Sequence, residues 1–237
     1  MLSKIDFRYI NSFLEPSAGK GDLAKEILRA YNNGFDKGQP KIDCIEIDPY
    51  LRQIIKYNFS EEALLPLKER LREIRAEQNL DYGERFRLEK EIEKELDQYK
   101  YHECVRVVYD DFLQYWPDDK YDAIIMNPPF DVGAKHLNHA IEIMKMHGGT
   151  IVCLLNAETI RNACDNHRRK LISAIEKYNA DVEFISGAFS NAERKTNVDI
   201  ALVTFKIPVI KRQSRIFTRL EEAEQRKRQE NAEYAEL

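Results

Sequence analysis

The sequence contains no apolar run long enough to cross a membrane and no N-terminal signal peptide. Its four cysteines lie far apart, with no Cys-x-x-Cys pair and no spacing typical of metal ligands. A disulfide scaffold and a zinc-ribbon site are therefore excluded, and we predict no metal site. These absences predict a cytoplasmic protein whose core is held together by side-chain packing.

A strong positive charge is also absent. The formal net charge is −4, which excludes a nucleic-acid binder that is basic over its whole surface. Basic residues are nevertheless concentrated in two places, because residues 194–219 carry seven Lys/Arg against one acid and residues 167–170 add a second cluster. We expect Arg194 and Lys195 to contact a phosphate backbone. For residues 211–219, a solvated helical tail is an equally good interpretation.

What the sequence does contain is an alternation of strand and helix patterns. Apolar runs predict strands at 11–15, 41–46, 105–109, 121–126, 150–155, 182–186 and 198–207. Amphipathic patterns predict helices at 22–32, 50–57, 134–147 and 159–178. This order predicts an α/β fold with a mostly parallel sheet covered on both faces, and the length of 237 residues fits one such domain with an insertion. The last two strands are predicted to form a hairpin.

Residues 59–103 are the predicted insertion. Leu67, Leu71 and Ile74 are spaced at i, i+4 and i+7, and a second helical pattern runs from Leu88 to Tyr99. We therefore predict an antiparallel helical hairpin that turns near residues 79–83. It carries nine Lys/Arg against thirteen Asp/Glu, so packing, partner binding or self-association is favoured over contact with phosphates. Residues 208–237 are predicted to be a charged tail, helical or disordered.

Two turns carry the candidate chemistry. Gly19 and Gly21 lie between the first strand and a helix, which is the nucleotide-binding corner of a doubly wound fold, and Glu46 ends the next strand. Asn127 to Phe130 (Asn-Pro-Pro-Phe) follows a buried strand. Two prolines make this turn rigid, and it presents an amide, a carbonyl and an aromatic face. That combination suits a planar ring with an exocyclic NH₂ group.

Together the segments 13–22, 45–49, 109–113 and 127–130 resemble the class I S-adenosylmethionine (SAM)-dependent methyltransferases, and among them the amino-methyltransferases of the N6-adenine type. The resemblance covers roughly residues 10–58 and 104–207. It implies a Rossmann-like methyltransferase domain over residues 1–207, with a seven-stranded, mostly parallel sheet and a reversed last strand. It also implies SAM as cofactor and the N6 amine of adenine in nucleic acid, DNA rather than RNA, as acceptor.

The resemblance also implies roles for individual residues. The glycine turn would pass under the amino-acid end of SAM, with Glu15 or Asp22 near its ammonium group, and Glu46 would accept the ribose hydroxyls. Asp111, with Asp110 as competitor, would bind the cofactor's adenine amine. The predicted cofactor-binding residues are Glu15, Pro16, Ala18, Gly19, Gly21, Asp22, Glu46, Ile47, Asp111, Phe112 and Asn127.

The predicted catalytic residues are Asn127, Pro128, Pro129 and Phe130. The Asn127 side chain and the Pro128 carbonyl would accept hydrogen bonds from the target amine while Phe130 stacks on its ring. Asp131 either contacts the target or caps the next helix. Arg194 and Lys195 would reach the substrate backbone. His136 and His139 are predicted to be packing or surface residues.

Other acceptors and classes remain open at this stage. A guanine N2 amine or a protein glutamine amide is also a planar NH₂ group, although Phe130 favours a nucleobase. Gly19-x-Gly21-x-x-Ala24 fits a loose dinucleotide fingerprint, but a dehydrogenase has no use for Asn-Pro-Pro-Phe. No target-recognition domain is expected after the last strand. We therefore also consider a SAM-binding subunit that needs a partner for recognition, or an enzyme acting on RNA.

Overall fold

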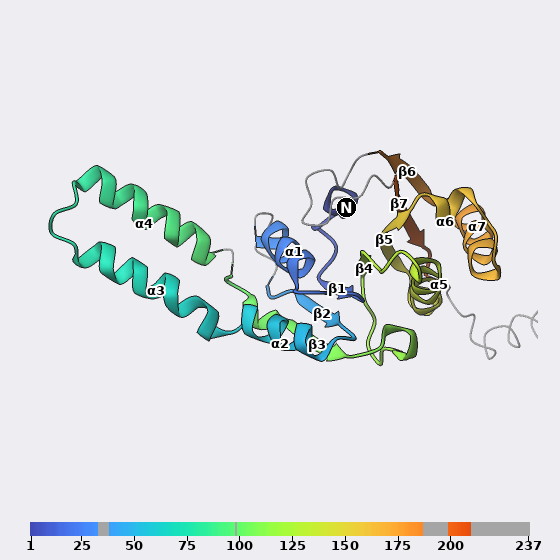
Figure 1. Cartoon of the computed structure of the whole chain (residues 1–237), viewed down its shortest axis with the longest axis horizontal. Helices are drawn as coiled ribbons and strands as arrows, with labels where there is room; N and C mark the ends of the chain where they lie inside the picture. The colour runs from blue at the N-terminus through green and yellow to red at the C-terminus, as the bar shows by residue number, and fades with distance from the viewer. Residues whose placement is uncertain (33–37, 98, 187–198, 210–237) are drawn as a thin grey trace, which may run out of the picture.

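The computed structural model describes residues 1–32, 38–97, 99–186 and 199–209. Within these residues, seven strands form one sheet in the order β3-β2-β1-β4-β5-β7-β6 (Figure 1). The strands are β1 (Ser12–Glu15), β2 (Lys41–Ile45), β3 (Val105–Tyr109), β4 (Ala123–Met126), β5 (Gly149–Asn156), β6 (Asp181–Ile185) and β7 (Ile200–Ile207). β1 to β5 pair in parallel, whereas β7 is antiparallel to both β5 and β6. This topology confirms the predicted α/β fold, with a seven-stranded, mostly parallel sheet and a reversed last strand.

Helices cover both faces of the sheet (Figure 1). They are α1 (Asp22–Asn32), α2 (Pro49–Asn58), α3 (Glu61–Ala76), α4 (Tyr82–Asp97), α5 (Gly133–Met144), α6 (Glu158–Arg161) and α7 (Asn166–Tyr178), with short 3-10 turns η1 (Leu2–Lys4), η2 (His102–Cys104) and η3 (Phe112–Gln114). One apolar cluster packs α5 and α7 on one face, and a second packs α1 and α2 on the other. Neighbouring strand residues serve opposite clusters, since Leu14 belongs to the first and Phe13 to the second. Both faces of the central parallel strands are therefore covered, and their residues are mostly apolar.

The region after β5 differs from the sequence prediction. One helix was expected over residues 159–178, but α6 ends at Arg161 and α7 begins at Asn166. Asp165 is the reason, because its carboxylate accepts hydrogen bonds from the backbone N–H groups of His167 (2.7 Å) and Arg168 (3.0 Å). These are the bonds of an N-cap, which starts a new helix instead of continuing the old one.

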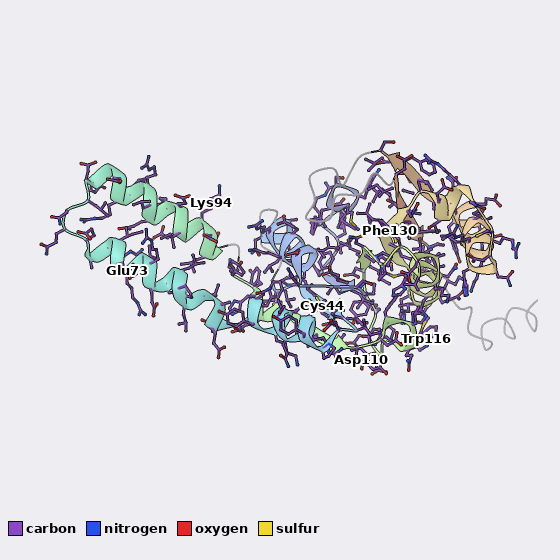
Figure 2. All side chains as sticks on the ribbon, in the orientation of Figure 1. Cys44, Glu73, Lys94, Asp110, Trp116 and Phe130 are labelled. Carbon is purple, nitrogen blue, oxygen red and sulfur yellow. The ribbon has the colours of Figure 1, made fainter. Side chains whose placement is uncertain are left out.

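The insertion forms the expected pair of helices. α3 and α4 lie side by side and extend away from the sheet (Figure 1). Their seam contains Ile74 and Ile92, which are buried, while Glu73 and Lys94 lie on the outer surfaces (Figure 2). Arg75 of α3 forms an ion pair of 2.7 Å with Glu93 of α4. Among the described residues, no helix combines the length and the apolar character needed to cross a membrane.

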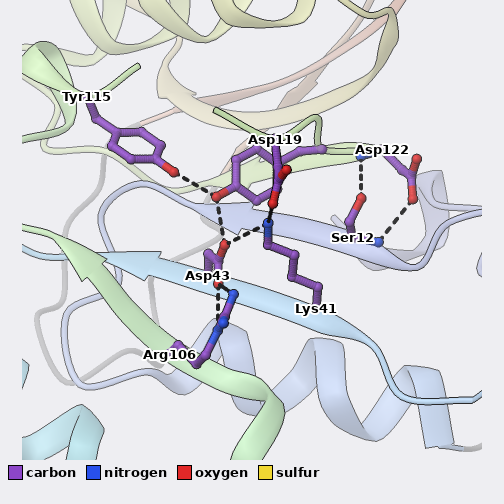
Figure 3. Close-up of polar contacts among 8 residues, drawn as sticks. Ser12, Lys41, Asp43, Arg106, Tyr115, Asp119 and Asp122 are labelled. Atoms are coloured by element: carbon purple, nitrogen blue, oxygen red, sulfur yellow. Dashed lines mark hydrogen bonds and ion pairs between the residues drawn. The ribbon is translucent and has the colours of Figure 1, made fainter. Parts of the chain in front are cut away.

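A buried acid ties the sheet together near the start of β4 (Figure 3). Asp43, in the middle of β2, is 2% exposed and accepts hydrogen bonds from the Tyr121 hydroxyl (2.7 Å) and the Arg106 guanidinium (2.8 Å). The Lys41 ammonium is 3.5 Å away, and the Tyr115 and Tyr121 hydroxyls are 2.8 Å apart. A buried carboxylate is tolerated only with such partners. Burial is also the main reason that the pKa of Tyr121 is raised.

Candidate active site

The predicted cofactor-binding segments follow the carboxyl ends of neighbouring strands. β1 pairs in parallel with β2 on one side and with β4 on the other, and β2 pairs with β3. The turns after these four strands therefore lie along one edge of the sheet. The strand order reverses direction between β1 and β4. Such a switch point is where open α/β sheets bind ligands.

The glycine-rich turn between β1 and α1 has two residues in the left-handed region. φ is +58° at Gly19 and +87° at Gly21, which other residues rarely adopt. A Cβ atom at Gly21 would lie 2.8 Å from Cε2 of Phe59, whereas one at Gly19 would have no atom within 4 Å. The Gly21 N–H donates to the Ala18 carbonyl (2.8 Å), and the Ala18 N–H donates to the Ile45 carbonyl (3.0 Å). Gly21 is thus fixed by packing, and the backbone at Gly19 is accessible to a ligand.

The two acids predicted near the SAM ammonium group have different surroundings. Glu15 ends β1 and is 2% exposed. Its carboxyl accepts a hydrogen bond from the backbone of Ala24 in α1 and lies 3.9 Å from the Cys44 thiol. Burial raises the pKa of Glu15 well above its ordinary value. Asp22 is exposed at the first position of α1. Glu15 therefore supports the glycine turn from the protein interior, and Asp22 is the acid that a ligand can reach.

Glu46 follows β2 and holds the glycine turn from the other side. Its carboxylate accepts hydrogen bonds from the Gly19 N–H (2.7 Å) and the Asp48 N–H (3.0 Å). Each oxygen keeps a further lone pair, so the side chain is oriented without losing its capacity to accept from hydroxyl groups. The next side chain, Ile47, is 70% exposed. A carboxylate beside an exposed apolar side chain can bind a sugar and the flat face of an attached ring.

Asp110 and Asp111 follow β3 on the same edge. Asp111 caps η3, because its carboxylate accepts hydrogen bonds from the Leu113 N–H (2.9 Å) and the Gln114 side-chain amide (2.8 Å). The Asp110 carboxylate accepts from the Asp111 N–H at 2.8 Å. Asp111 is half-buried and fixed, whereas Asp110 is exposed. Both acids lie at the edge, and the fixed position of Asp111 suits a defined ligand contact.

Phe112 is not placed where its predicted contact with a ligand ring requires. The ring is 2% exposed and packs against the rings of His136 and His139, with centroid distances of 5.5 and 4.9 Å. Nε2 of His139 lies 2.8 Å from the Tyr115 carbonyl, and burial lowers the pKa of His136. Phe112 is therefore a core residue. The two histidines are packing residues, as the sequence predicted.

The Asn127 to Phe130 turn connects β4 directly to α5. Asn127 and Pro129 are exposed, Pro128 is buried and Phe130 is half-buried. The Pro129 carbonyl accepts a hydrogen bond from the Val132 N–H at 3.2 Å, which closes the turn before the helix. Because β4 is fully buried, this turn rests on a fixed base. The Asn127 amide is thus presented on a rigid backbone beside the switch point.

A cavity of about 260 Å³ lies beside this turn, between the start of α5 and the connection from α6 to α7. Its lining residues are Phe130, Asp131, Ala134, Lys135, Thr159, Asp165, His167 and Arg168. Asp131 lines the cavity and does not cap α5, since the start of that helix has no side-chain cap. The Arg168 guanidinium is held by the Asn162 carbonyl (3.1 Å) and lies 3.4 Å from the Asp165 carboxylate. Lys135 and Arg168 line the same cavity as the aromatic ring of Phe130.

The structure brings together most of the predicted site. Predicted residues with exposed or half-buried positions are Gly19, Asp22, Ile47, Asp111, Asn127, Pro129, Phe130 and Asp131. Predicted residues that are buried are Glu15, Pro16, Ala18, Gly21, Glu46, Phe112 and Pro128. Arg194 and Lys195 lie outside the described residues. The sequence did not identify Lys135 and Thr159 as residues of the cavity, because no motif marks them. It identified the basic run at 167–170 but not that this run lies at the same cavity as Phe130.

Comparison with known proteins adds a family match and distant structural similarities. Residues 90–151 match the model of the methyltransferase small domain. A search of curated proteins found no significant sequence match. A dimethyladenosine transferase from Plasmodium falciparum is 14% identical, with a TM-score of 0.49, over 85% of this chain and 60% of that one. The 23S rRNA methyltransferase ErmE is 16% identical, with a TM-score of 0.47, over 83% of this chain and 61% of that one.

The chain thus spans about three fifths of the length of both solved structures. The family match is more local. It includes β3, η3, β4, the Asn127 to Phe130 turn and α5. The segment that is similar to the methyltransferase small domain therefore contains the turn at the centre of the candidate site.

Proposed function

We propose that the protein is a SAM-dependent methyltransferase that methylates the N6 amine of adenine in DNA. The observation that carries this proposal is the position of the Asn127 to Phe130 turn directly across the switch point from the glycine turn after β1. One turn offers acceptors for a planar amine, and the other offers an accessible backbone for a ligand. The match of residues 90–151 to the methyltransferase small domain supports the same reaction class.

The residues after β1, β2 and β3 fit the methyl donor. Glu46 would accept the ribose hydroxyls with the lone pairs left free by Gly19 and Asp48. Asp111 would accept from the donor's adenine amine, and Ile47 would pack on its ring in the place first assigned to Phe112. Asp22 would lie near the ammonium group. SAM supplies an activated methyl group on a sulfonium, so the protein needs to supply position and electrostatics.

The turn after β4 would prepare the acceptor. The lone pair of an exocyclic adenine amine is delocalised into the ring, which makes the nitrogen a poor nucleophile. Hydrogen bonds from the amine to the Asn127 side-chain oxygen and the Pro128 carbonyl would favour a nitrogen whose lone pair is available. The nitrogen then bonds to the methyl carbon as the carbon–sulfur bond breaks, and the product loses its extra proton to solvent. Stacking on Phe130 would hold the base, worth about 1–3 kcal/mol.

The cavity beside Phe130 supports a nucleic-acid substrate. Lys135 and Arg168 line it, and α7 begins there with the basic run 167–170. Cations next to an aromatic ring are the combination that single-stranded or flipped nucleotides require, because the ring takes the base and the cations take the phosphates. Asp131 and Asp165 also line the cavity, so its charge is mixed.

The test is a methyl-transfer assay with labelled SAM and, in parallel, unmethylated DNA and total RNA. Nucleosides from each digest are identified by mass spectrometry. We expect N6-methyldeoxyadenosine, and we expect Asn127→Ala to abolish it while SAM binding persists. Asn79→Ala is the matched control, because Asn79 is exposed in the hairpin turn, far along the chain from the site. Product in RNA alone would reassign the polymer, and SAM binding without transfer to either polymer would overturn the proposal.

A further inference from the structure

The two ends of the α3–α4 insertion meet at a group of three potential metal ligands. Glu61 is the first residue of α3, and His102 and Glu103 lie in η2, where the chain returns to β3. One ligand atom from each residue can be chosen so that all three lie within 4.8 Å of one another. In Figure 1 this is the base of the hairpin, where α3 leaves the sheet and the chain from α4 comes back to it.

The state of His102 is what distinguishes this group from an ordinary acidic cluster. The residue is 7% exposed. Its Nδ1 lies 2.9 Å from the Tyr99 carbonyl, so Nδ1 carries a proton, and in the neutral imidazole the lone pair is then on Nε2. Nε2 is buried and has no hydrogen-bond partner in the structure. A backbone carbonyl that fixes the imidazole in this way is the usual outer support of a metal-binding histidine.

The distance between His102 and Glu61 also fits a shared metal ion. Nε2 of His102 lies 3.5 Å from Oε1 of Glu61. Bonds of about 2.0–2.1 Å at tetrahedral angles would place two ligand atoms about 3.4 Å apart. The second oxygen of Glu61 is bound by the Lys68 ammonium, which leaves Oε1 to face the histidine. Both glutamates are exposed, so a metal ion and a water ligand can reach the group from solvent.

We propose that Glu61, His102 and Glu103 bind one divalent transition-metal ion, of the class of Zn²⁺, at the base of the hairpin. One imidazole and two carboxylates from separate residues form a donor set that suits Zn²⁺ better than Mg²⁺ or Ca²⁺, which prefer oxygen alone. The ion would join the start of α3 to the segment before β3. It would close the loop formed by residues 61–103 and fix the direction of the hairpin relative to the sheet. This site is independent of the proposed methyl transfer.

Isothermal titration of untagged, metal-free protein with Zn²⁺ alone, and separately with Mg²⁺, tests the proposal. We expect one saturable Zn²⁺ site per chain and no comparable Mg²⁺ site. His102→Asn and Glu103→Gln should each weaken Zn²⁺ binding about tenfold or more. Glu62→Gln is the matched control, since Glu62 is exposed in the same turn of α3 and lies outside the group. Hydrogen exchange should slow on Zn²⁺ addition at both ends of the hairpin.

Several outcomes would overturn the proposal. These are the absence of a saturable Zn²⁺ site, an equal loss of binding in Glu62→Gln, or full retention in both Glu103→Gln and His102→Asn. Should His102→Asn fail to fold, Glu103→Gln decides alone, because Glu103 is exposed and its loss leaves no buried group. Destabilisation by Glu61→Gln without any Zn²⁺ binding would identify a plain ion pair between Glu61 and His102.

Discussion

Glu15 shows how one buried carboxyl links the site to stability. Burial is the largest cause of its raised pKa, and the nearby acids Asp22 and Glu46 add to it. The hydrogen bond from the Ala24 backbone opposes the shift without removing it. In the unfolded chain the group titrates near its ordinary pKa of 4.5. As pH rises above that value, the unfolded state loses the proton first, so the folded state loses stability until the folded pKa is passed.

Glu15→Gln should remove this pH dependence. Glutamine cannot ionise, so the free energy of unfolding of the variant relative to the wild type should increase as the pH rises above the ordinary pKa of 4.5. Urea unfolding at a series of pH values measures it. Glu26→Gln, the same substitution at an exposed position of α1, is the matched control. Parallel stability curves for Glu15→Gln and the wild type would contradict the expected role of burial.

The sequence identified Glu46 by its position at the end of a strand and Glu15 through the family resemblance, but it did not reveal their surroundings. Glu46 is oriented by the Gly19 backbone, and that contact depends on how β1 and β2 pair. Asp43 is a stronger case. It interrupts an apolar strand, and the residues that neutralise it, Arg106 and Tyr121, come from distant segments of the chain. Motifs therefore locate a site in the sequence, whereas the burial and the hydrogen-bond partners of its side chains can be known only from the tertiary structure.

The α3–α4 hairpin behaves as an element with its own small core. Ile74 and Ile92 are buried in its seam, and neither belongs to the two clusters that pack the sheet. An element with few contacts to the main core can open without unfolding the rest. Ile92→Ala should therefore destabilise the hairpin by about 2–4 kcal/mol. Hydrogen exchange should become faster in α3 and α4 but not in β1, β4 or β5.

Leu65→Ala provides the control for this prediction. Leu65 is also a large apolar residue of the hairpin, but it is 51% exposed, so its loss should change stability by no more than about 0.5 kcal/mol. If Ile92→Ala instead accelerated exchange equally in the central strands, the hairpin and the sheet would form one cooperative unit, and the separate core would be refuted.

At the level of elements, periodicity was a good guide wherever one face of a helix meets the core. The pattern at 22–32 coincides with α1, and the apolar spacing of the insertion indicated both hairpin helices. It failed at residues 162–165, where the apolar pattern continues across a break. The break depends on the hydrogen bonds that Asp165 accepts from the first turn of α7. From the sequence alone, an aspartate within a helical pattern can either continue the helix or cap a new one.

On the scale of the whole molecule, the acidic hairpin and the cavity that Lys135 and Arg168 line lie at opposite ends. Figure 1 shows α3 and α4 at one end of the sheet and α6 and α7 at the other. A net charge of −4 would repel a polyanion in general, so nucleic acid should approach from the α5–α7 side. The molecule would then bind DNA through a local patch, while the hairpin stays clear of it.

Lys135→Ala tests this orientation. Lys135 is exposed at the start of α5, and if it contacts a phosphate its loss should weaken DNA binding at all sequences and reduce the slope of log K against log salt by about 1. Fluorescence anisotropy with a labelled duplex over a salt series measures both. Lys94→Ala removes an equal charge from the hairpin and should leave the slope unchanged. Each variant lowers the net charge by the same amount, so a difference in slope between them depends on where the lysine lies. A reduced slope for Lys94→Ala and an unchanged slope for Lys135→Ala would place the phosphate backbone on α4 and contradict the proposed orientation.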